Sequence, residues 1–554
     1  MKKKSARFSV IAAVIIGVTA IFAFDNPDKR YFDITKNLDI FSTLFKEVNA
    51  FYVDEVNSNK LIRTGIEAML ASLDPYTNYI PEDDIEDYRT MTTGQYGGIG
   101  AVIGRKNGKN VIIMPYIGFP AHKSGLKIGD EIMTVDGVDV KDKNTSEISQ
   151  LLKGQANTPL KLKISRYGQK DLIDIDITRE KITIDNVPYL GMVHDGVGYI
   201  KLSEFTTGAG REVKRAVERL KKEGAENIII DLRDNPGGLL NEAVNVSNVF
   251  VPRGSEIVST KGKVTDWNKT YKALNNTTDM KIPVAVLTSR RSASAAEIVA
   301  GVIQDYDRGV LVGERTFGKG LVQATRPLTY NSQLKITTAK YYIPSGRCIQ
   351  AINYSERNEN GSVAKIPDSL RVAFRTNNNR IVYDGGGVSP DVKVASPTLT
   401  PIAISLLTNG LVFDYAIKYH YEHAEIASAR EFKLTDTEYE NFIQWLSDKD
   451  YDYTTRVEKT IEDLKKAAKK EKYYDKIEDK IDLLEAEVMH NKDKDLREFE
   501  KEIRSLLESR IVETYYLMKG TFEASFDDDA QLIEAVNLLN DPERYKELLI
   551  AKTD

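Results

Sequence analysis

The sequence predicts an α/β protein with helical segments at both ends. In residues 185–400, short apolar runs alternate with amphipathic stretches, the pattern of strands and helices around a largely buried sheet. Residues 401–554 are rich in charge and carry apolar residues at helical spacing, and residues 30–90 show the same spacing. A chain of 554 residues is too long for a single core, so several domains are expected.

The first residues have the pattern of an export signal. Three lysines, Lys2 to Lys4, precede an almost purely apolar run over residues 8–24. A clean small-residue cleavage site is missing, and the run is borderline for spanning a bilayer. Two interpretations stay open: residues 1–25 are a cleaved signal peptide, or residues 8–24 anchor the chain in the inner membrane. Both predict that the rest of the chain is exported to the periplasm.

A compact unit is predicted over residues 92–180. It contains the glycine turn Gly98-Ile99-Gly100-Ala101, a PA…SGLKIGDEI stretch, a helix-like piece and the alternating strand of residues 160–166. The glycine spacing does not fit a dinucleotide fingerprint, because no βαβ unit follows it. The unit resembles a PDZ domain, in which backbone N–H groups of such a turn hold the C-terminal carboxylate of a bound peptide. The alternative is a plain β-turn with no ligand.

The segment that follows the PDZ-like unit alternates between strands and helices. Strands are predicted over residues 198–202, 227–232 and 284–288, and helices over residues 210–222 and 239–250. A polar turn, RDNPGG, connects the second of these strands to the second helix. We therefore expect a sheet whose strand ends carry loops rich in glycine and polar residues.

A serine cluster lies between the predicted strand of residues 284–288 and a predicted helix of residues 295–303. Ser294 stands at this strand-to-helix turn, where the helix N-terminus directs free N–H groups and a positive dipole at a nearby oxyanion. Its small alanine neighbours let a substrate backbone approach. Ser292 and Ser294 also fit a helix-capping role, which explains a serine there but explains the alanine-rich surroundings less well.

Lys319 follows in the sequence FGKGLV, between apolar or small residues. A lysine can take a proton from a serine only if its amine is neutral, which burial favours by lowering its pKa. This setting fits a desolvated base, and the alternative is a lysine on a surface turn. The stretch 313–320 nearly matches the phosphate-binding pattern G-x-x-x-x-G-K-[ST]. However, Gly320 replaces the hydroxyl residue and a strand is predicted to follow, so no phosphate loop is expected.

The composition argues against several other kinds of site. A net charge of -5 gives no global reason to expect a nucleic-acid partner. The single cysteine, Cys348, excludes an internal disulfide and zinc sites built from cysteine pairs. None of the five histidines accompanies the serine cluster, which disfavours a Ser-His-Asp triad. His420 and His423 have no evident third ligand, so we expect no metal and no cofactor.

Taken together, the motifs resemble those of the carboxyl-terminal processing proteases, also called tail-specific proteases, of the S41 serine peptidase family. The similarity rests on the order of a signal or anchor, helices, a PDZ unit, DLRDNPGG, SASAAE and GERTFGKGLVQ. It covers roughly residues 35–400. It implies a crotonase-like protease core over residues 185–400 with the N-terminal region, and an inserted PDZ domain. The helical extension over residues 401–554 lies outside the shared core.

The resemblance implies a role for each matched position. Ser294 is expected to be the nucleophile, Lys319 the general base, and Gln323 the residue that orients the lysine. The backbone N–H groups of Gly237 and Ala295 are expected to form the oxyanion hole, and whether the glycine after Gly237 serves instead is open. The turn Gly98–Ala101 is expected to bind the substrate's C-terminal tail.

The sequence thus predicts an exported endopeptidase that forms an acyl-enzyme and acts on proteins with exposed C-terminal tails. The rival hypothesis is a non-catalytic PDZ scaffold or chaperone at the membrane. A homodimer through the N- or C-terminal helices is a further expectation. An intact set of Ser294, Lys319 and Gln323 favours the enzyme.

Overall fold

The computed structural model describes residues 27–354, 363–488 and 492–551. The predicted signal or anchor over residues 8–24 lies outside these described residues. The chain divides into two compact units, residues 1–79 and residues 80–554. Among the described residues, no helix is long and apolar enough to cross a membrane.

In the described part of the first unit, residues 27–79, the chain forms the helices α2 (Pro27–Phe51) and α3 (Ser58–Ala71). Asn57 caps α3, because its side chain accepts a hydrogen bond from the backbone N–H of Lys60 at 3.0 Å. Large apolar side chains of α2 are exposed, including Leu38 at 65%. The expectation of helices in this region is confirmed for α2 and α3.

The second unit begins with a short helix, α4 (Ile85–Thr93), and a two-stranded ribbon of β2 (Gln95–Gly98) and β9 (Glu180–Thr183). Between these two strands the chain forms a sheet in the order β3-β4-β5-β7-β8, with β6 paired to β5. The elements of this segment, in chain order, are β3 (Ala101–Lys106), β4 (Lys109–Pro115), α5 (Pro120–Lys123), β5 (Glu131–Val135), β6 (Val138–Asp139), α6 (Thr145–Leu152), β7 (Pro159–Ser165) and β8 (Ile173–Thr178). The inward residues of this sheet form their own apolar core.

The centre of the second unit is a six-stranded sheet in the order β10-β11-β12-β15-β16-β21. The first pair is antiparallel and the other pairs are parallel. The strands are β10 (Tyr189–His194), β11 (Val197–Lys201), β12 (Asn227–Asp231), β15 (Val284–Thr288), β16 (Val310–Gly313) and β21 (Val392–Lys393). The predicted α/β class with a largely parallel, buried sheet is confirmed.

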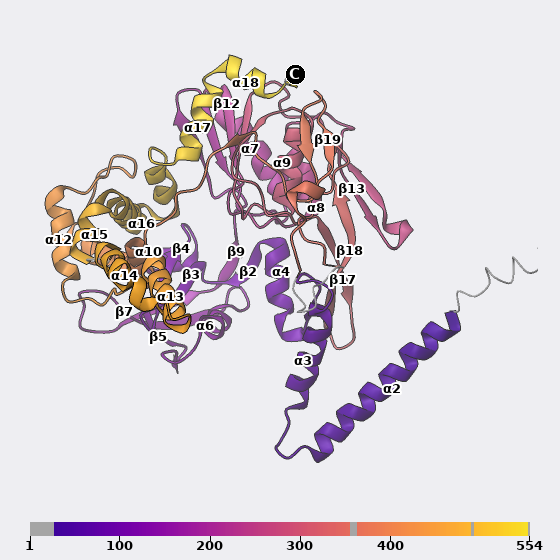
Figure 1. The fold of residues 1–554 in the computed structure, drawn as a ribbon, viewed down its shortest axis with the longest axis horizontal. Helices are drawn as coiled ribbons and strands as arrows, with labels where there is room; N and C mark the ends of the chain where they lie inside the picture. Colours follow the sequence, from indigo (N-terminus) through magenta and orange to yellow (C-terminus); the bar gives the residue numbers. More distant parts are fainter. Residues whose placement is uncertain (1–26, 355–362, 489–491, 552–554) are drawn as a thin grey trace, which may run out of the picture. The chain divides into compact units, whose positions relative to one another are not determined.

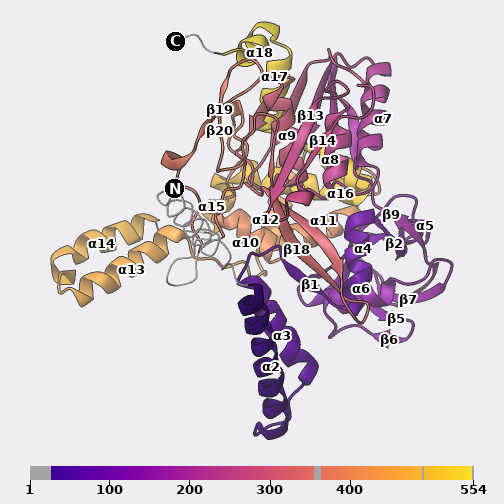
Figure 2. The same cartoon turned by 90° about the vertical axis from the view of Figure 1, so that its right-hand side faces the viewer.

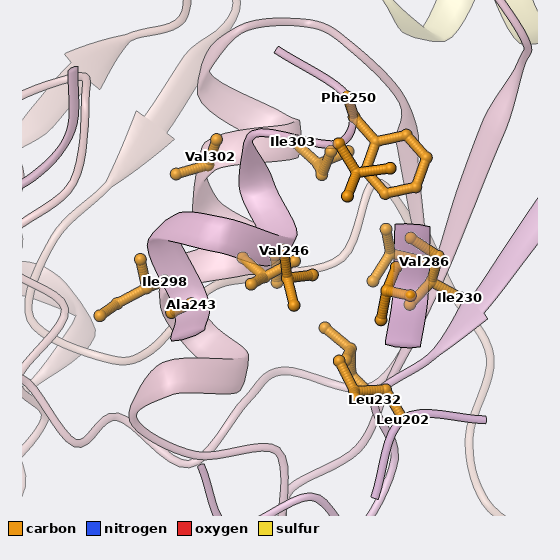
Figure 3. Packing of buried hydrophobic residues seen from close by; sticks show 14 of the residues in the cluster. Leu202, Ile230, Leu232, Ala243, Val246, Phe250, Val286, Ile298, Val302 and Ile303 are labelled. Atoms are coloured by element: carbon orange, nitrogen blue, oxygen red, sulfur yellow. The ribbon is translucent and has the colours of Figure 1, made fainter. Parts of the chain in front are cut away.

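Three helices cover one face of this sheet: α7 (Ala209–Lys222), α8 (Leu240–Ser247) and α9 (Ala295–Asp305). Figure 3 shows Ile230 and Val286 of the strands packed toward the side chains of α8 and α9, such as Val246 and Ile303. Neighbouring residues along a strand point to opposite faces, so Ile229 belongs to a different apolar cluster. Both faces of the sheet are therefore buried.

A second, smaller sheet lies against these helices. It contains β13 (Glu256–Gly262), β14 (Lys269–Lys272), β17 (Leu321–Pro327) and β18 (Gln333–Tyr342). β18 pairs with both β13 and β17, and β13 contacts α8 and α9 (Figure 2). A short hairpin of β19 (Ala373–Arg375) and β20 (Ile381–Tyr383) follows. The strand expected after Lys319 is confirmed as β17.

The C-terminal region is helical, as predicted. Its helices are α10 (Pro401–Thr408), α11 (Leu411–Glu422), α12 (Asp436–Leu446), α13 (Arg456–Lys470), α14 (Tyr474–Val488), α15 (Lys492–Glu498), α16 (Glu500–Ser525), α17 (Ala530–Leu539) and α18 (Pro542–Leu548). Helix α16 is interrupted at Leu517, whose φ of 54° and ψ of −153° are not helical.

The last two helices complete the α/β core. Leu532, Leu538 and Tyr545 of α17 and α18 pack on the sheet face opposite to α7, α8 and α9, and Figure 1 shows α17 beside β12. The Tyr545 hydroxyl donates to the carbonyl of Val284 and accepts from its N–H, each at 3.0 Å. The C-terminal extension is therefore part of the layered α/β core as well as a helical domain.

Candidate active site

Ser294 occupies the turn between β15 and α9, directly before the first residue of the helix. Its φ of 56° and ψ of −113° are rare for a residue other than glycine. Such a conformation costs about 1–3 kcal/mol and persists only where the surroundings hold it. The neighbouring Ser292 is fully buried, and its hydroxyl donates to the carbonyl of Leu232 at 2.7 Å. Of the two serines, Ser292 therefore has a structural role, and Ser294 has the strained backbone conformation.

Glu297, one turn into α9, holds the strained turn in place. Its carboxylate is fully buried and accepts hydrogen bonds from the backbone N–H groups of Ser294 and Lys319, both at 2.8 Å. The other oxygen accepts from the N–H of Gly318 at 2.7 Å and from the hydroxyl of Thr316 at 2.6 Å. One side chain thus connects the serine turn to the lysine turn.

The carboxylate of Glu297 accepts its four hydrogen bonds from neutral groups. Burial raises its pKa to about 7, while the hydroxyl of Thr316 and the backbone N–H groups of Lys319, Ser294 and Gly318 act in the opposite direction. In the ionised form, each of the two carboxylate oxygens accepts two hydrogen bonds. Protonation would require an O–H to face one of these donors, which couples the site geometry to pH.

Tyr341 of β18 makes a second connection between the two turns. Its buried hydroxyl donates to the carbonyl of Lys319 at 2.5 Å and lies 3.1 Å from the carbonyl of Ser294. The backbones of the predicted nucleophile and the predicted base are therefore tied at their N–H groups by Glu297 and at their carbonyls by Tyr341.

The predicted catalytic residues line one cavity of about 440 Å³, which contains Ser294, Ala295, Lys319 and Gln323. Gln323 lies in β17, and its side-chain amide donates to the hydroxyl of Thr337 at 3.2 Å. The structure thus brings together residues from the start of α9, the turn that carries Lys319 and β17. Ser294 and Gln323, the two furthest apart, are separated by 29 positions in the chain.

A second lysine shares this cavity. Lys335 of β18 is half-buried, and burial lowers its pKa from its ordinary value. Its position was not anticipated, because nothing in the local sequence distinguishes it from a surface lysine on a strand. It provides a natural comparison for Lys319 in mutagenesis.

Gly237 lies against the serine turn, and the next residue, Gly238, lies against Phe205. A methyl group on Gly237 would lie 2.8 Å from Cβ of Ser294 and 2.9 Å from the backbone nitrogen of Ala295, so only glycine fits there. The N–H of Gly237 already donates to the side-chain oxygen of Asn235 at 2.8 Å. Within the described part of the chain, the N–H groups of Gly238 and Ala295 have no acceptor. In this conformation the Gly237 N–H is engaged, and an oxyanion role for either glycine stays a prediction.

The loop that carries these glycines is anchored from two sides. Arg233 binds Asp231 at the end of β12 and Asp529 before α17, at 2.6 and 2.7 Å. The buried Asn235 donates to the carbonyl of Leu202 at 2.7 Å, and its own carbonyl accepts from the N–H of Ala293 at 2.9 Å. The C-terminal extension thus contributes an ion pair to the base of the candidate site.

The predicted peptide-binding turn begins at the end of β2. Gly98 is the last residue of that strand, and Ala101 is the first residue of β3. Ile99 is buried and its carbonyl accepts from the N–H of Ala121 at 2.8 Å. Gly100 has a φ of 74°, and a methyl group on it would lie 2.5 Å from Cβ of Phe119. The turn is therefore a tightly packed element of the domain.

Among the described residues, no group of three or more His, Cys, Asp and Glu side chains could hold a metal ion. Cys348 is away from the serine cavity, and burial raises the pKa of its thiol. Sequence reasoning missed Glu297 and Tyr341. The S-x-x-E spacing of a capping box at Ser294 was a signal for Glu297, whereas Tyr341 had none.

Comparison with known families gives three matches along the chain. Residues 196–355 match Peptidase family S41, residues 115–166 match the PDZ domain, and residues 402–539 match the family described as "Probable PDZ-protease, C-terminal helical domain". The matches follow the order of the α/β core, the inserted sheet and the helical extension.

Two curated proteins show how far the similarity extends. A carboxy-terminal-processing protease of Bartonella bacilliformis is 36% identical over 347 residues, 62% of this chain and 78% of that protein. The carboxy-terminal processing protease CtpA of Bacillus subtilis is 29% identical over 478 residues, 84% of this chain and all (100%) of that protein.

A solved structure described as photosystem II D1 C-terminal processing protease is 28% identical, with a TM-score of 0.35. The match covers 67% of this chain and 96% of that one.

Proposed function

The chain belongs to peptidase family S41 and contains a PDZ domain, and on this premise we propose that it is a serine endopeptidase with Ser294 as nucleophile and Lys319 as base. The observation that carries the proposal is the clamp formed by Glu297, whose carboxylate binds the backbone N–H groups of both residues at 2.8 Å. A buried carboxylate arranged in this way supports a site that depends on fixed geometry between the two turns.

In the proposed mechanism, the oxygen of Ser294 attacks the carbonyl carbon of the scissile bond while its proton passes to the amine of Lys319. The oxyanion of the tetrahedral intermediate accepts hydrogen bonds from the N–H of Ala295 and from one of the two glycines: Gly237 lies against Ser294 and Ala295, but its N–H donates to Asn235 in this conformation. Lys319 then gives the proton to the leaving amine, and an ester with Ser294 remains. Water activated by Lys319 hydrolyses this ester.

Gln323 is proposed to orient the amine of Lys319. Its location in the same cavity and the support that it receives from Thr337 of β18 favour this role. The proposal requires no metal and no cofactor. It retains the expectation that the enzyme acts after export, which rests on the sequence of residues 1–25.

Substrate proteins are proposed to bind by their C-terminal tails at the turn Gly98–Ala101. A peptide with a free C-terminal carboxylate is expected to have a kcat/KM about 10- to 100-fold above that of the same peptide with a C-terminal amide. This range corresponds to the loss of one hydrogen bond to a charged group. Steady-state kinetics on the two peptides measure the difference, which should appear mainly in KM.

The matched variants for this test are Gly100→Val and Gly108→Asn. Valine at Gly100 meets Phe119 and a φ of 74°, so it should remove the preference for the carboxylate. Gly108 also has a positive φ, of 77°, but a methyl group there would meet nothing within 4 Å, and asparagine tolerates that conformation. Equal cleavage of acid and amide peptides by the wild-type enzyme would refute tail recognition.

We also propose that α2 pairs with a second copy of this chain. Six apolar residues of the helix are spaced alternately by three and four positions, the pattern of a two-stranded helical seam: Tyr31, Ile34, Leu38, Phe41, Phe45 and Val48. Four of them are 49–71% exposed within the single chain. An exposed seam of this length is expected to be covered in solution.

Replacing Leu38 with glutamate is expected to raise the dimer dissociation constant at least about 10-fold, since a charge in the seam loses apolar burial and adds desolvation. Sedimentation equilibrium of Leu38→Glu and of the off-seam variant Asn37→Glu measures the change. A wild-type chain that sediments as a monomer at micromolar concentration would contradict the pairing.

A further inference from the structure

A second cavity, of about 490 Å³, lies where three parts of the second unit meet. The PDZ domain contributes Tyr116, Ile117 and Phe119, which follow β4. The protease core contributes the segment 183–190 and residues after β11, and the helical extension contributes Met518. This cavity, called the junction cavity below, is therefore built by contact between domains.

This cavity adjoins the serine cavity. Glu204 lines both of them. Tyr116 of the PDZ domain and Glu204 of the protease core both line the first of these cavities, and burial, followed by the charge of Glu204, raises the pKa of the Tyr116 hydroxyl. Burial also raises the pKa of Glu204 itself. The wall between the two cavities is thus a half-buried acid beside a tyrosine.

The same cavity adjoins the tail-binding turn on its other side. The N–H of Tyr116 donates to the carbonyl of Gly100 at 2.9 Å. Gly100 also packs against Phe119, whose Cβ would lie 2.5 Å from an added methyl group. Tyr116 and Phe119 of the junction cavity therefore contact the turn, and Glu204 lines both the junction cavity and the serine cavity.

The walls of the junction cavity are mainly apolar. Ile117 is 59% exposed although it lines the cavity, and Leu517 and Met518 come from the interrupted part of α16. Leu517 has a positive φ, a strained conformation that its surroundings must hold. Strain of this kind clusters at active sites and ligand clamps.

We propose that the junction cavity is a substrate subsite, which receives a bulky apolar side chain between the scissile bond and the C-terminal tail. This inference rests on the proposed function, because it needs a tail held at Gly98–Ala101 and cleavage at Ser294. An extended polypeptide that runs from the turn past Tyr116 and Glu204 to Ser294 would cross the junction cavity. The enzyme then selects substrates by two features, a free carboxyl terminus and an apolar residue upstream of it.

The test compares three substrates. Two are series of peptides with the same free C-terminus, in which each position between cleavage site and tail carries in turn leucine or phenylalanine in one series and serine in the other. The third is a short aryl ester that reaches only the serine cavity. At one of these positions, the kcat/KM of the peptide with the apolar residue is expected to be about 10-fold or more above that of the peptide with serine.

The variant Ile117→Asp should remove that preference and leave hydrolysis of the aryl ester unchanged. Ile117→Leu should preserve the preference. Val138→Asp is the matched control, since Val138 is 43% exposed on the same domain but does not line the cavity. Retention of the preference in Ile117→Asp, or its equal loss in Val138→Asp, would overturn the subsite. Ester hydrolysis that persists in Ser294→Ala would instead refute the proposed function.

Discussion

Replacing Ser294 with alanine is expected to lower kcat/KM for a tailed peptide by at least about 10⁴-fold, with the fold preserved. The bond from its backbone N–H to Glu297 does not involve the hydroxyl, so the turn retains its main support. Lys319→Ala should cause a loss of similar size, because a serine without a base is a weak nucleophile and residues that act as a unit are not additive.

Lys335→Met provides the comparison for the lysine. The substitution removes an amine from the same cavity. Lys335 lies on β18 and, among the described residues, makes no hydrogen bond to Glu297 or Tyr341. Its effect on kcat/KM is expected to be less than about 10-fold. A loss of this size fits a changed electrostatic field in the cavity, whereas loss of the general base would cost more. Peptide cleavage followed by chromatography measures all three variants, and thermal unfolding reports their folds. A greater loss in Lys335→Met than in Lys319→Ala would reassign the base.

Replacing Glu297 with glutamine is expected to lower kcat by about 10²-fold or more, although Glu297 does not contact the substrate in the proposed mechanism. An amide has one acceptor oxygen where the carboxylate has two, so its NH₂ group must face two of the four donors. The turns of Ser294 and Lys319 then lose their common support, and a displacement of about 1 Å is sufficient for such a loss. Glu242→Gln is the control, because that carboxylate also accepts two backbone N–H groups, at Gly208 and Gly210.

The pH dependence of stability identifies the ionisation of Glu297. Its pKa is raised from 4.5 to about 7 in the folded protein. The folded state therefore binds the proton more tightly than the unfolded state, and stability is greatest below pH 4.5 and falls as pH rises through 7. Between pH 5 and pH 8 the wild type should lose about 2–3 kcal/mol relative to Glu297→Gln. Parallel pH profiles of thermal unfolding for the two proteins would contradict this.

The local pattern was sufficient to predict the elements that present the site. The apolar run over residues 284–288, the alanine-rich stretch after Ser294 and the alternation after Lys319 gave β15, α9 and β17. These elements depend on short-range spacing of apolar residues, which the sequence displays directly.

What could not be predicted depends on contacts between distant segments. Nothing near Tyr341 or Tyr545 marks a hydroxyl that binds the backbone of another element. The amphipathic pattern of α17 predicts a helix with a buried face, but it does not say that this face covers the protease sheet. The engagement of the Gly237 N–H by Asn235 is likewise a property of the folded loop. Motif similarity alone could not choose between the two glycines.

The most direct test of the central claim is to trap the acyl-enzyme. A peptidyl aryl ester whose aryl leaving group carries the preferred tail acylates faster than a peptide, so deacylation limits turnover and the intermediate accumulates. After acid quench, mass spectrometry of the digested protein is predicted to find the acyl group on the peptide with Ser294. Its formation should be absent in Ser294→Ala and greatly slowed in Lys319→Ala. An acyl group on another residue, or full peptidase activity with no burst and no adduct, would contradict the assignment of Ser294 as the nucleophile.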